Sequence, residues 1–432
     1  MGGKDPFIKK DDPPKVVPNA EVLKRVNLRD RRFVYRSALK YLAEERLFLQ
    51  TANIEDSTLE ITYAQSTHTS FPRATGRAIR ILDAITPDYI DTFKISNING
   101  YIGMHSVKFN RDDFAKNMQN KHYKLATKNM VVTPYNLDSD DHEFQPEIEL
   151  PAFFWKLTPA VRSQIGGPDG FYFGDLRLAF HSEGIVRKNL SIISTATFGI
   201  VNNFGPLKLE SDSILPHVRT DIVRYLKQTR ESALQRAQFN YFMKPTTNIY
   251  AKISGGIFEE MFGGYGGEIL YRPFLQSFAV GAEIWKVKQR DYDQRLRFRD
   301  YETTTGHINL YYKEPRSQVI IAIKGGRFLA EDSGINFDFS RRFKSGLRIG
   351  AFFSKTDISK LEFGEGSFDK GFYFFIPIES FFNKYSKGLS GFGLRPITRD
   401  GAASLVHAQH LWGTSEQGQL LNFNRDLDDL YD

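Results

Sequence analysis

Six acidic residues in the second half of the chain are candidates for acid–base chemistry. Hydrolysis of a glycosidic bond requires two carboxyl groups placed on either side of that bond. Glu260 and Glu268 flank a glycine-rich stretch and are a possible facing pair, although a structural role is commoner for such residues. Spacing along the chain does not pair the candidates, so we predict that the protein is not an enzyme. The six are Glu259, Glu260, Glu268, Glu283, Asp291 and Glu365.

Two histidines, His407 and His410, are three residues apart. That spacing suits a metal ion only on a helix with a third ligand nearby. The absence of cysteine excludes a disulfide framework, a thiolate nucleophile and a Cys-ligated metal. No GxSxG or HExxH signature is present. We therefore expect no metal and no other cofactor.

The stretch Gly255–Pro273 predicts a β-hairpin. Residues 249–257 alternate in character with the two-residue period of a strand. Four glycines between 263 and 267 permit positive φ, which suits a tight reversal. A phosphate-binding loop would instead open a helix and carry a lysine before Ser or Thr, which is absent here. The hairpin is the better interpretation.

From Gly170 onward the period of two continues, and the segments are separated by turn residues. In one of them Phe278, Val280 and Ile284 oppose Gly281 and Glu283. We count roughly twelve such segments, near the length that a tilted membrane strand requires. One face is Phe, Ile, Leu and Val, while the other mixes charges with Gly, Asn and Tyr. We predict an antiparallel β-barrel whose apolar face contacts lipid and whose polar face lines a wet lumen; a β-sandwich or soluble barrel is the alternative.

Composition sets only broad limits on function. The 432 residues carry a formal net charge of +7, which favours acidic partners such as anionic glycans, lipid head groups or nucleic acid without choosing among them. No run of eighteen or more apolar residues exists, so a bundle of transmembrane helices is excluded. Residues 1–6 lack the apolar region of a signal peptide.

The first part of the chain has a different organisation. We predict a linker over 1–30, a small α+β domain over 31–125 with the order α-β-α-β-β-α, and a second linker over 126–165 that includes the acidic run 138–143. The barrel then spans 166–412, and 413–432 form a flexible acidic tail. An amphipathic helix is expected over 218–236, with a basic outer side; it is either a solvated helix at the barrel end or a plug facing an acidic polymer.

Several short motifs follow one another along the chain: Val218–Asp221 with Tyr225–Leu226, Gly255–Pro273, Gln289–Asp291, Thr305–His307, Gly326–Ala330 and Phe363–Gly371. Their order and spacing together are fairly specific. On these motifs the chain resembles the YjbH/GfcD-like family of outer-membrane proteins tied to exopolysaccharide and capsule export, and the resemblance covers most of residues 30–410.

This resemblance implies a mainly β outer-membrane barrel of a Gram-negative cell, preceded by a small α+β periplasmic domain. The implied role is export or assembly of an exopolysaccharide or capsular polysaccharide. The implied partners are outer-membrane lipid, the polysaccharide and periplasmic export proteins of the same pathway, with no nucleic acid. Family members resemble larger proteins with another barrel N-terminal to these domains, so we expect this chain to be a C-terminal portion.

Transport needs no bond chemistry, because Tyr, Asn, Arg and Glu side chains bind sugars weakly enough to let a polymer slide. Two alternatives stay open: an outer-membrane enzyme acting on glycan or lipid, and a structural barrel that anchors the periplasmic domain for partners. The residues predicted to contact polysaccharide in the lumen are Arg219, Arg224, Tyr225, Tyr250, Lys252, Glu268, Arg272, Glu283, His307, Asn309 and Tyr311.

Overall fold

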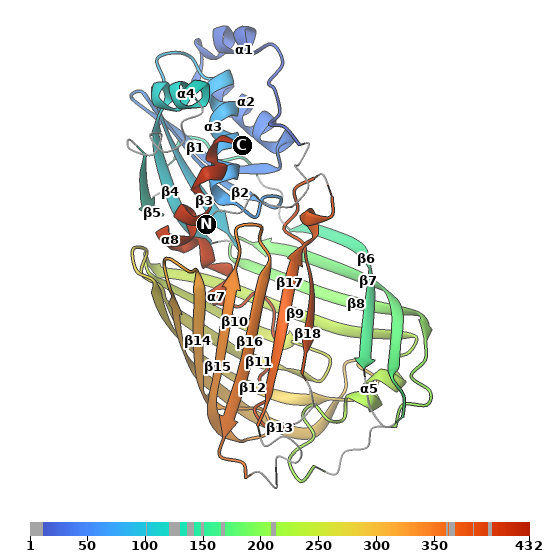
Figure 1. Cartoon of the computed structure of the whole chain (residues 1–432). Coiled ribbons are helices and arrows are strands. Elements are labelled where there is room, and N and C mark those ends of the chain that lie inside the picture. The colour runs from blue at the N-terminus through green and yellow to red at the C-terminus, as the bar shows by residue number, and fades with distance from the viewer. Residues whose placement is uncertain are drawn as a thin grey trace.

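The protein is built from two β-sheets that lie one above the other (Figure 1). The computed structural model describes residues 12–100, 102–120, 130–135, 142–147, 151–165, 169–208, 213–359, 362, 368–382, 384–395 and 400–432. Within these ranges a five-stranded sheet belongs to the N-terminal part, and a thirteen-stranded antiparallel sheet follows it. The protein is therefore mainly β, as the sequence predicts.

The small domain is an α+β unit whose helices include α3, which crosses over between two parallel strands. The sheet order is β1-β2-β3-β4-β5, and only the β2–β3 pair is parallel. Pro72 at the start of α3 and the Ser70 side chain, which accepts a hydrogen bond from Arg73 N, define where that helix begins. The elements are α1 (Ala20–Asn27), α2 (Arg31–Glu44), β1 (Leu47–Glu55), β2 (Thr58–Gln65), α3 (Phe71–Ile85), β3 (Thr92–Asn99), β4 (Ile102–Asn110), α4 (Arg111–Asn120) and β5 (Val131–Pro134).

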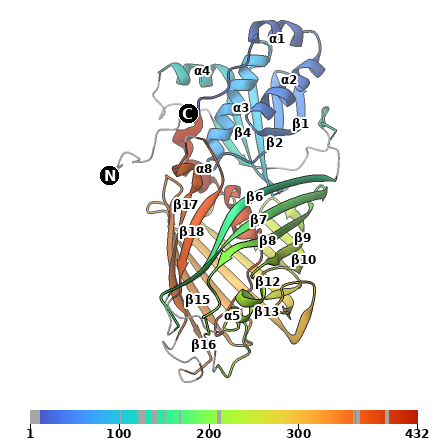
Figure 2. The same ribbon diagram turned by 90° about the vertical axis from the view of Figure 1, so that its right-hand side faces the viewer.

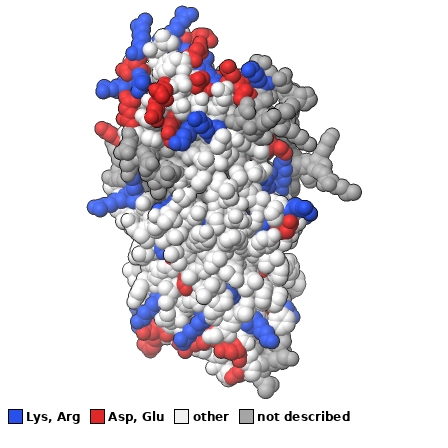
Figure 3. Space-filling view, turned by 90° about the vertical axis from the view of Figure 1, so that its left-hand side faces the viewer, with Lys and Arg blue, Asp and Glu red and all other residues white. Residues whose placement is uncertain are grey.

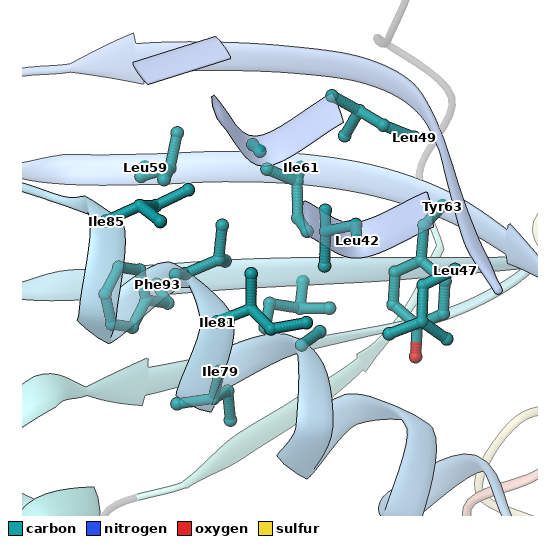
Figure 4. Close-up of a cluster of buried hydrophobic side chains, with 14 of the residues drawn as sticks. Leu42, Leu47, Leu49, Leu59, Ile61, Tyr63, Ile79, Ile81, Ile85 and Phe93 are labelled. Carbon is teal, nitrogen blue, oxygen red and sulfur yellow. The ribbon is translucent and has the colours of Figure 1, made fainter. Parts of the chain in front are cut away.

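The core of the small domain is apolar and fully buried (Figure 4). Leu59, Ile61 and Phe93 from the strands meet Leu42 and the aliphatic side chains of α3. Those positions recur every three or four residues along the helices and every two along the strands, so one face of each element is apolar.

The small domain extends beyond the range that the sequence predicts. Strand β1 was not predicted; a register shift between Leu49 and Thr51 interrupts its alternation. Helix α1 lies within the predicted linker 1–30, and β5 lies within the predicted linker 126–165. The first strand of the large sheet, β6, also lies within that second linker. Residues 138–141 of the acidic run are outside the described residues.

The large sheet runs in sequence order from β6 to β18, and every neighbouring pair is antiparallel. It curls around an interior, as two perpendicular views show (Figures 1 and 2). Within the described residues the edge strands β6 and β18 are not paired with each other, so a closed barrel remains a prediction. The strands are β6 (Ala152–Ile165), β7 (Tyr172–Arg187), β8 (Leu190–Asn202), β9 (Ser232–Thr246), β10 (Ile249–Ile257), β11 (Phe262–Tyr271), β12 (Phe278–Arg290), β13 (Phe298–Lys313), β14 (Val319–Arg327), β15 (Ser333–Arg342), β16 (Arg348–Thr356), β17 (Lys370–Pro377) and β18 (Leu389–Leu394).

In this sheet the apolar side chains face outward and the polar ones face inward, which is the reverse of a soluble protein. On β12 the side chains of Val280 and Ile284 are exposed, Ile284 to 63%, whereas Glu283 on the opposite face is buried. On β13 Ile308 is exposed and its neighbour His307 is buried. Figure 3 shows the result on one face: a broad band with few visible charged side chains, with most Lys, Arg, Asp and Glu gathered above and below it.

The glycine-rich hairpin is present, but its glycines do not form the turn. β10 ends at Ile257 and β11 begins at Phe262, so the reversal lies between these residues and the glycines lie inside β11. A Cβ at Gly266 would lie 2.1 Å from the carbonyl oxygen of Ile284 and 2.6 Å from the Trp285 ring. This glycine is therefore needed for the close approach of β12 and its tryptophan.

The helix predicted over 218–236 is shorter in the structure. Helix α5 spans Ile222–Gln228, and Leu234 and Arg236 belong to β9 instead. None of the described helices has the length and apolar character needed to cross a bilayer.

Residues 400–432 form a segment that we call the inner segment. It contacts inward-facing residues of the large sheet and then packs against the small domain, where Phe423 and Leu430 join the apolar core. This packing differs from the flexible tail predicted for 413–432. The segment contains α7 (Leu411–Thr414), η3 (Glu416–Gly418), α8 (Leu420–Arg425) and η4 (Leu427–Tyr431).

Candidate functional site

A row of four ionisable side chains crosses the inner face of the large sheet. In the strand register Lys252 on β10 lies opposite Glu268 on β11, Glu268 opposite Glu283 on β12, and Glu283 opposite His307 on β13. Residues directly opposite each other have their Cβ atoms about 5 Å apart. The register therefore brings together side chains that are up to 55 positions apart in the sequence.

Glu268 is held by three groups besides Lys252, its register partner on β10. Its Oε1 lies 3.0 Å from His407 Nε2 and 3.0 Å from His410 Nδ1, and its Oε2 accepts a hydrogen bond of 2.8 Å from Leu411 N. Lys252 Nζ lies 3.4 Å from Oε2. The carboxylate thus joins the wall of the sheet to the inner segment.

Glu283 is surrounded in a similar way. Lys324 Nζ lies 3.0 Å and His307 Nδ1 3.2 Å from its Oε1, while Trp285 Nε1 donates a 3.2 Å hydrogen bond to its Oε2. His407 Nε2 is 3.4 Å from the same Oε2. Like charges opposite each other in a sheet are destabilising. Cationic and donor groups between and around the two glutamates therefore offset their repulsion.

Lys252 is the central cation among these ion pairs and hydrogen bonds, which we call the charge network. Its side chain is fully buried, and Nζ donates to the carbonyl oxygens of Ala408, at 3.1 Å, and Gln409, at 3.0 Å. Nζ also lies 3.2 Å from His407 Nδ1. A buried ammonium group requires such partners, because its desolvation is otherwise costly.

A small pocket opens beside this network. Its polar lining includes both glutamates, Asn309, Lys324 and His410, and its aromatic lining is Tyr311 and Trp412. The rings of Tyr311 and Trp412 stack with their centroids 4.0 Å apart and nearly parallel. The Oδ1 atom of Asn309 is buried and has no hydrogen-bond partner among the described residues. The pocket thus presents polar groups that are not fully satisfied.

The inner segment is also anchored at the end of the sheet near α5. Asp400 accepts hydrogen bonds from the backbone N atoms of Arg219 and Thr220 and from Thr220 Oγ1. Farther along the chain, Leu329 N donates to Ala403 O. The segment is therefore held at both ends of the interior.

At the small-domain end the segment carries a buried carboxylate, Glu416. Burial alone would raise the pKa of Glu416, but the charges of Arg342, Arg425 and Lys313 outweigh that effect and hold the pKa well below its usual range. Arg342 Nη1 lies 2.9 Å from Glu416 Oε2. This ion pair fastens η3 to β15.

A buried histidine of the small domain also contacts the inner segment. His105 Nδ1 lies 3.1 Å from Gln417 O, and its Nε2 lies 3.3 Å from Asn97 Nδ2. A carbonyl oxygen can only accept a hydrogen bond, so Nδ1 carries the hydrogen and Nε2 accepts a hydrogen bond from Asn97. Burial lowers the pKa of His105 to about 4, so the ring is neutral at pH 7.

Six of the eleven residues predicted to line the lumen meet in or beside this network. Tyr250 and Arg272 are buried nearby, and Arg272 lies over the Trp412 ring, 3.8 Å from its centroid. The six are Lys252, Glu268, Glu283, His307, Asn309 and Tyr311.

The other three predicted residues lie near α5. Arg219 pairs with Glu259 at 2.9 Å, Arg224 Nη1 donates to Tyr292 Oη, and Tyr225 is buried in an apolar cluster with Val218 and neighbouring side chains. That cluster fills this end of the interior, so Tyr225 does not border open space. Glu260 does not face Glu268, the arrangement that their positions around the glycine-rich stretch allow; it accepts a hydrogen bond from Gln235.

Several of the motifs singled out in the sequence lie together at the same end of the large sheet, near α5. Val218, Phe258, Leu329 and Ala330, which come from three of the motifs, share one buried cluster. Gln289 Nε2 donates to His217 O, and Arg290 donates to the carbonyls of Glu259 and Glu260. Residues 363–367 of the last motif, with the candidate acid Glu365, are outside the described residues. The motifs that the structure describes are therefore mostly packing and hydrogen-bonding elements.

Sequence reasoning missed the inner segment's part in the site. His407 and His410 carried a signal, their three-residue spacing, but they precede α7 rather than lie on a helix. The carboxylates beside them come from strands more than 120 positions earlier. Only the register of β11 and β12 reveals the cluster.

The sequence of the chain matches a known protein family over most of its length. The model of the YjbH family, described as "Exopolysaccharide biosynthesis protein YbjH", matches residues 4–417. The chain belongs to this family. The resemblance seen in the sequence is thereby confirmed.

A curated relative is 32% identical over 265 residues. It is the protein of Escherichia coli strain K12 named "Uncharacterized lipoprotein YjbH". The aligned part covers 60% of this chain and 38% of the relative. The match thus spans well under half the length of that relative.

Proposed function

We propose that the chain takes part in the export or assembly of an exopolysaccharide as an outer-membrane β-barrel with a periplasmic domain. The inverted sheet is the observation that carries this proposal: large apolar side chains cover its outer face, and ionisable ones line its inner face. Burying an apolar face in lipid removes the cost of exposing it to water. The family's description as an exopolysaccharide biosynthesis protein supports the choice of polymer.

The outer surface has the layout expected of a membrane-spanning sheet. Ile269, Ile284 and Ile308 lie on three adjacent strands, and each is more than half exposed. The sparsely charged band in Figure 3 lies between charged rims, as lipid tails lie between head groups. An exposed apolar area of this extent on a monomeric soluble protein would promote aggregation.

The inner segment sets a condition on export. It passes along the inner face, where Lys252, Glu268 and Arg272 contact it. A polymer that crosses the same interior must displace the segment, whereas a role in assembly at the membrane needs no displacement. In the export version the segment is a plug that moves.

We propose that no bond is made or broken. In the described residues Glu268 and Glu283 are engaged by lysine and histidine, and Glu259 is paired with Arg219. A general acid must hold a proton that it can give to the leaving group, whereas lysine and histidine side chains surround the carboxylates of Glu268 and Glu283. Incubation of the purified chain with exopolysaccharide is expected to release no reducing ends.

The membrane proposal is testable with single cysteines, since the chain has none of its own. A nitroxide label placed at Ile284→Cys or Ile308→Cys, in protein reconstituted into vesicles, should collide with oxygen and be shielded from a water-soluble nickel reagent. The control is Val22→Cys on α1, which is 59% exposed and belongs to the small domain. Equal nickel accessibility at all three positions contradicts the barrel.

The export proposal is testable in Gram-negative cells that lack the gene and carry a variant copy. Tyr311→Ala removes an inward ring that stacks on Trp412, and we expect it to change the amount of secreted polysaccharide. The matched control is Tyr312→Ala, the next residue, which faces outward and is 46% exposed. Equal secretion by the two variants contradicts a role for the inner face.

A second candidate function is a structural one, in which the large sheet anchors the small domain for partner proteins. The filled interior favours it, because the inner segment joins the sheet to the small-domain core. In that case inner-face variants leave secretion unchanged, and substitutions on the surface of the small domain reduce it.

A further inference from the structure

Two histidines and two glutamates converge inside the large sheet in an arrangement that none of the proposals above uses. His407 and His410 come from the inner segment, Glu268 from β11 and Glu283 from β12. Each offers one ligand atom, and the four atoms all lie within 4.8 Å of one another. We propose that these four residues form a binding site for a divalent transition-metal ion such as Zn²⁺.

The distances fit the chemistry of such an ion. Zn²⁺ binds imidazole nitrogen and carboxylate oxygen at about 2.1 Å, so ligand atoms of a tetrahedral site lie about 3.4 Å apart. Glu268 Oε1 is 3.0 Å from both His407 Nε2 and His410 Nδ1, and Glu283 Oε2 is 3.4 Å from His407 Nε2. Small side-chain shifts therefore place four ligands around one ion.

A second observation points to a ligand at the same place. Asn309 lines the adjoining pocket with Glu268, Glu283 and His410, and it is 7% exposed. Its Oδ1 has no hydrogen-bond partner among the described residues, although buried acceptors are usually satisfied. The pocket also provides an entry path, because the His410 side chain at its edge is 45% exposed.

Lys252 competes with the ion for the same groups. Its Nζ lies 3.4 Å from Glu268 Oε2 and 3.2 Å from His407 Nδ1. When a metal takes Nε2 of His407, the ring proton moves to Nδ1, where the carbonyl oxygen of Ala408 is 3.4 Å away. Lys252 keeps its own bonds to the Ala408 and Gln409 carbonyls. Removing this lysine should therefore strengthen metal binding.

Metal binding links two parts of the chain that are distant in sequence. Both histidines lie on the inner segment and both glutamates on the wall, so one ion fastens the segment to the sheet. Metal binding should slow hydrogen exchange of residues 402–412 selectively. This effect does not depend on whether the chain exports polysaccharide.

The test uses the full chain in detergent micelles after treatment with EDTA, with Co²⁺ and then Zn²⁺ as the probes. We expect one Co²⁺ per chain, a visible absorption band typical of N and O ligands, and displacement of Co²⁺ by Zn²⁺. The double variant H407Q/H410Q should bind at least about 100-fold more weakly. The matched control is His181→Gln on β7, whose ring contacts Thr158 and Thr195, and it should bind as the wild type does.

Two further measurements keep the proposal testable where the double variant does not fold. Lys252→Met should bind Zn²⁺ more tightly than the wild type, and Zn²⁺ should protect residues 402–412 in the unaltered protein. Wild-type protein that takes up no Co²⁺, or binding of equal strength in H407Q/H410Q and the wild type, overturns the site. The second result identifies an adventitious surface ion only.

Discussion

The small domain and the large sheet place the same kinds of side chain in opposite positions. In the small domain Leu59, Ile61 and Phe93 are buried together; in the large sheet Ile284 and Ile308 are exposed and Glu283 is buried. Both regions satisfy the alternation of a β-strand, so alternation alone does not tell which face is inside. The difference is decided by what covers each face: helices in one region, and in the other the inner segment on one side and, as we propose, lipid on the other.

The comparison also separates two sources of stability. The small domain depends on the removal of apolar area from water. The interior of the large sheet depends on a charge network in which each buried group needs its partner. Substitutions that remove atoms should therefore act through a cavity in the first region and through unpaired charge in the second.

The largest effect is expected from breaking the charge network. Glu283→Ala leaves Lys324, His307 and Trp285 without their common partner, and unpairing buried charge typically costs about 3–5 kcal/mol. Chemical unfolding in detergent micelles measures this loss. Glu283→Gln, which keeps an acceptor oxygen, is the control and should lose less. Equal stability of Glu283→Ala and the wild type would show that the network is not needed.

A cavity in the small-domain core should have a somewhat smaller effect. Leu82→Ala on α3 removes a side chain that is 0% exposed, and such changes cost about 2–5 kcal/mol. Leu310→Ala on the outer face of β13, where the side chain is 46% exposed, makes the same chemical change as a control. Hydrogen exchange resolved by peptide should locate the loss in residues 31–110. Equal losses in the two variants would contradict the inverted arrangement.

A charge on the outer face tests the lipid contact directly. Ile284→Arg should destabilise the reconstituted protein by about 2–4 kcal/mol if the residue lies near the middle of a bilayer. The same substitution at an exposed site on a soluble surface costs little. Val22→Arg on α1 supplies that comparison. A cost within about 0.5 kcal/mol at both positions would place Ile284 in water.

The small domain should lose stability in acid through His105. Its pKa is about 4 in the folded chain and about 6.5 unfolded, so the unfolded state binds more protons between these values. The contribution of His105 to the free energy of unfolding should therefore be constant above about pH 6.5. It should fall by at most about 3 kcal/mol as pH decreases to 4. His105→Gln should remove this part of the pH dependence. Buried His68, whose pKa burial lowers to about 3, acts in the same direction in both proteins and cancels in the comparison.

The elements with a clear period could be predicted from the sequence. The alternation of residues 278–284 predicts a strand with an apolar and a polar face, and the structure confirms it. The second helix of the predicted order α-β-α-β-β-α is present as α3, where Pro72 and the spacing of Ala78, Ile81 and Ile85 are its signals in the sequence. Strand β1 was missed, since a bulge disturbs its period.

The site could be predicted only in part. Lys252, Glu268, Glu283 and His307 are predicted to face the lumen because each lies on the polar face of its strand, but their alignment in one row depends on strand register. Register is set by the turns and by the pairing of neighbouring strands, so it cannot be predicted from the sequence of a single strand. The inner segment was missed for a related reason: a short, polar C-terminus resembles a free end unless its contacts with distant strands are known.

The route of the inner segment couples distant parts of the sequence during folding. Phe423, Leu430 and Tyr431 complete a core whose other fully buried members lie between residues 17 and 114. The small domain therefore cannot finish folding until these side chains reach it, and contacts between such distant positions slow folding. Deletion of residues 420–432 should accordingly damage the small domain, whose strands and helices lie some three hundred positions earlier.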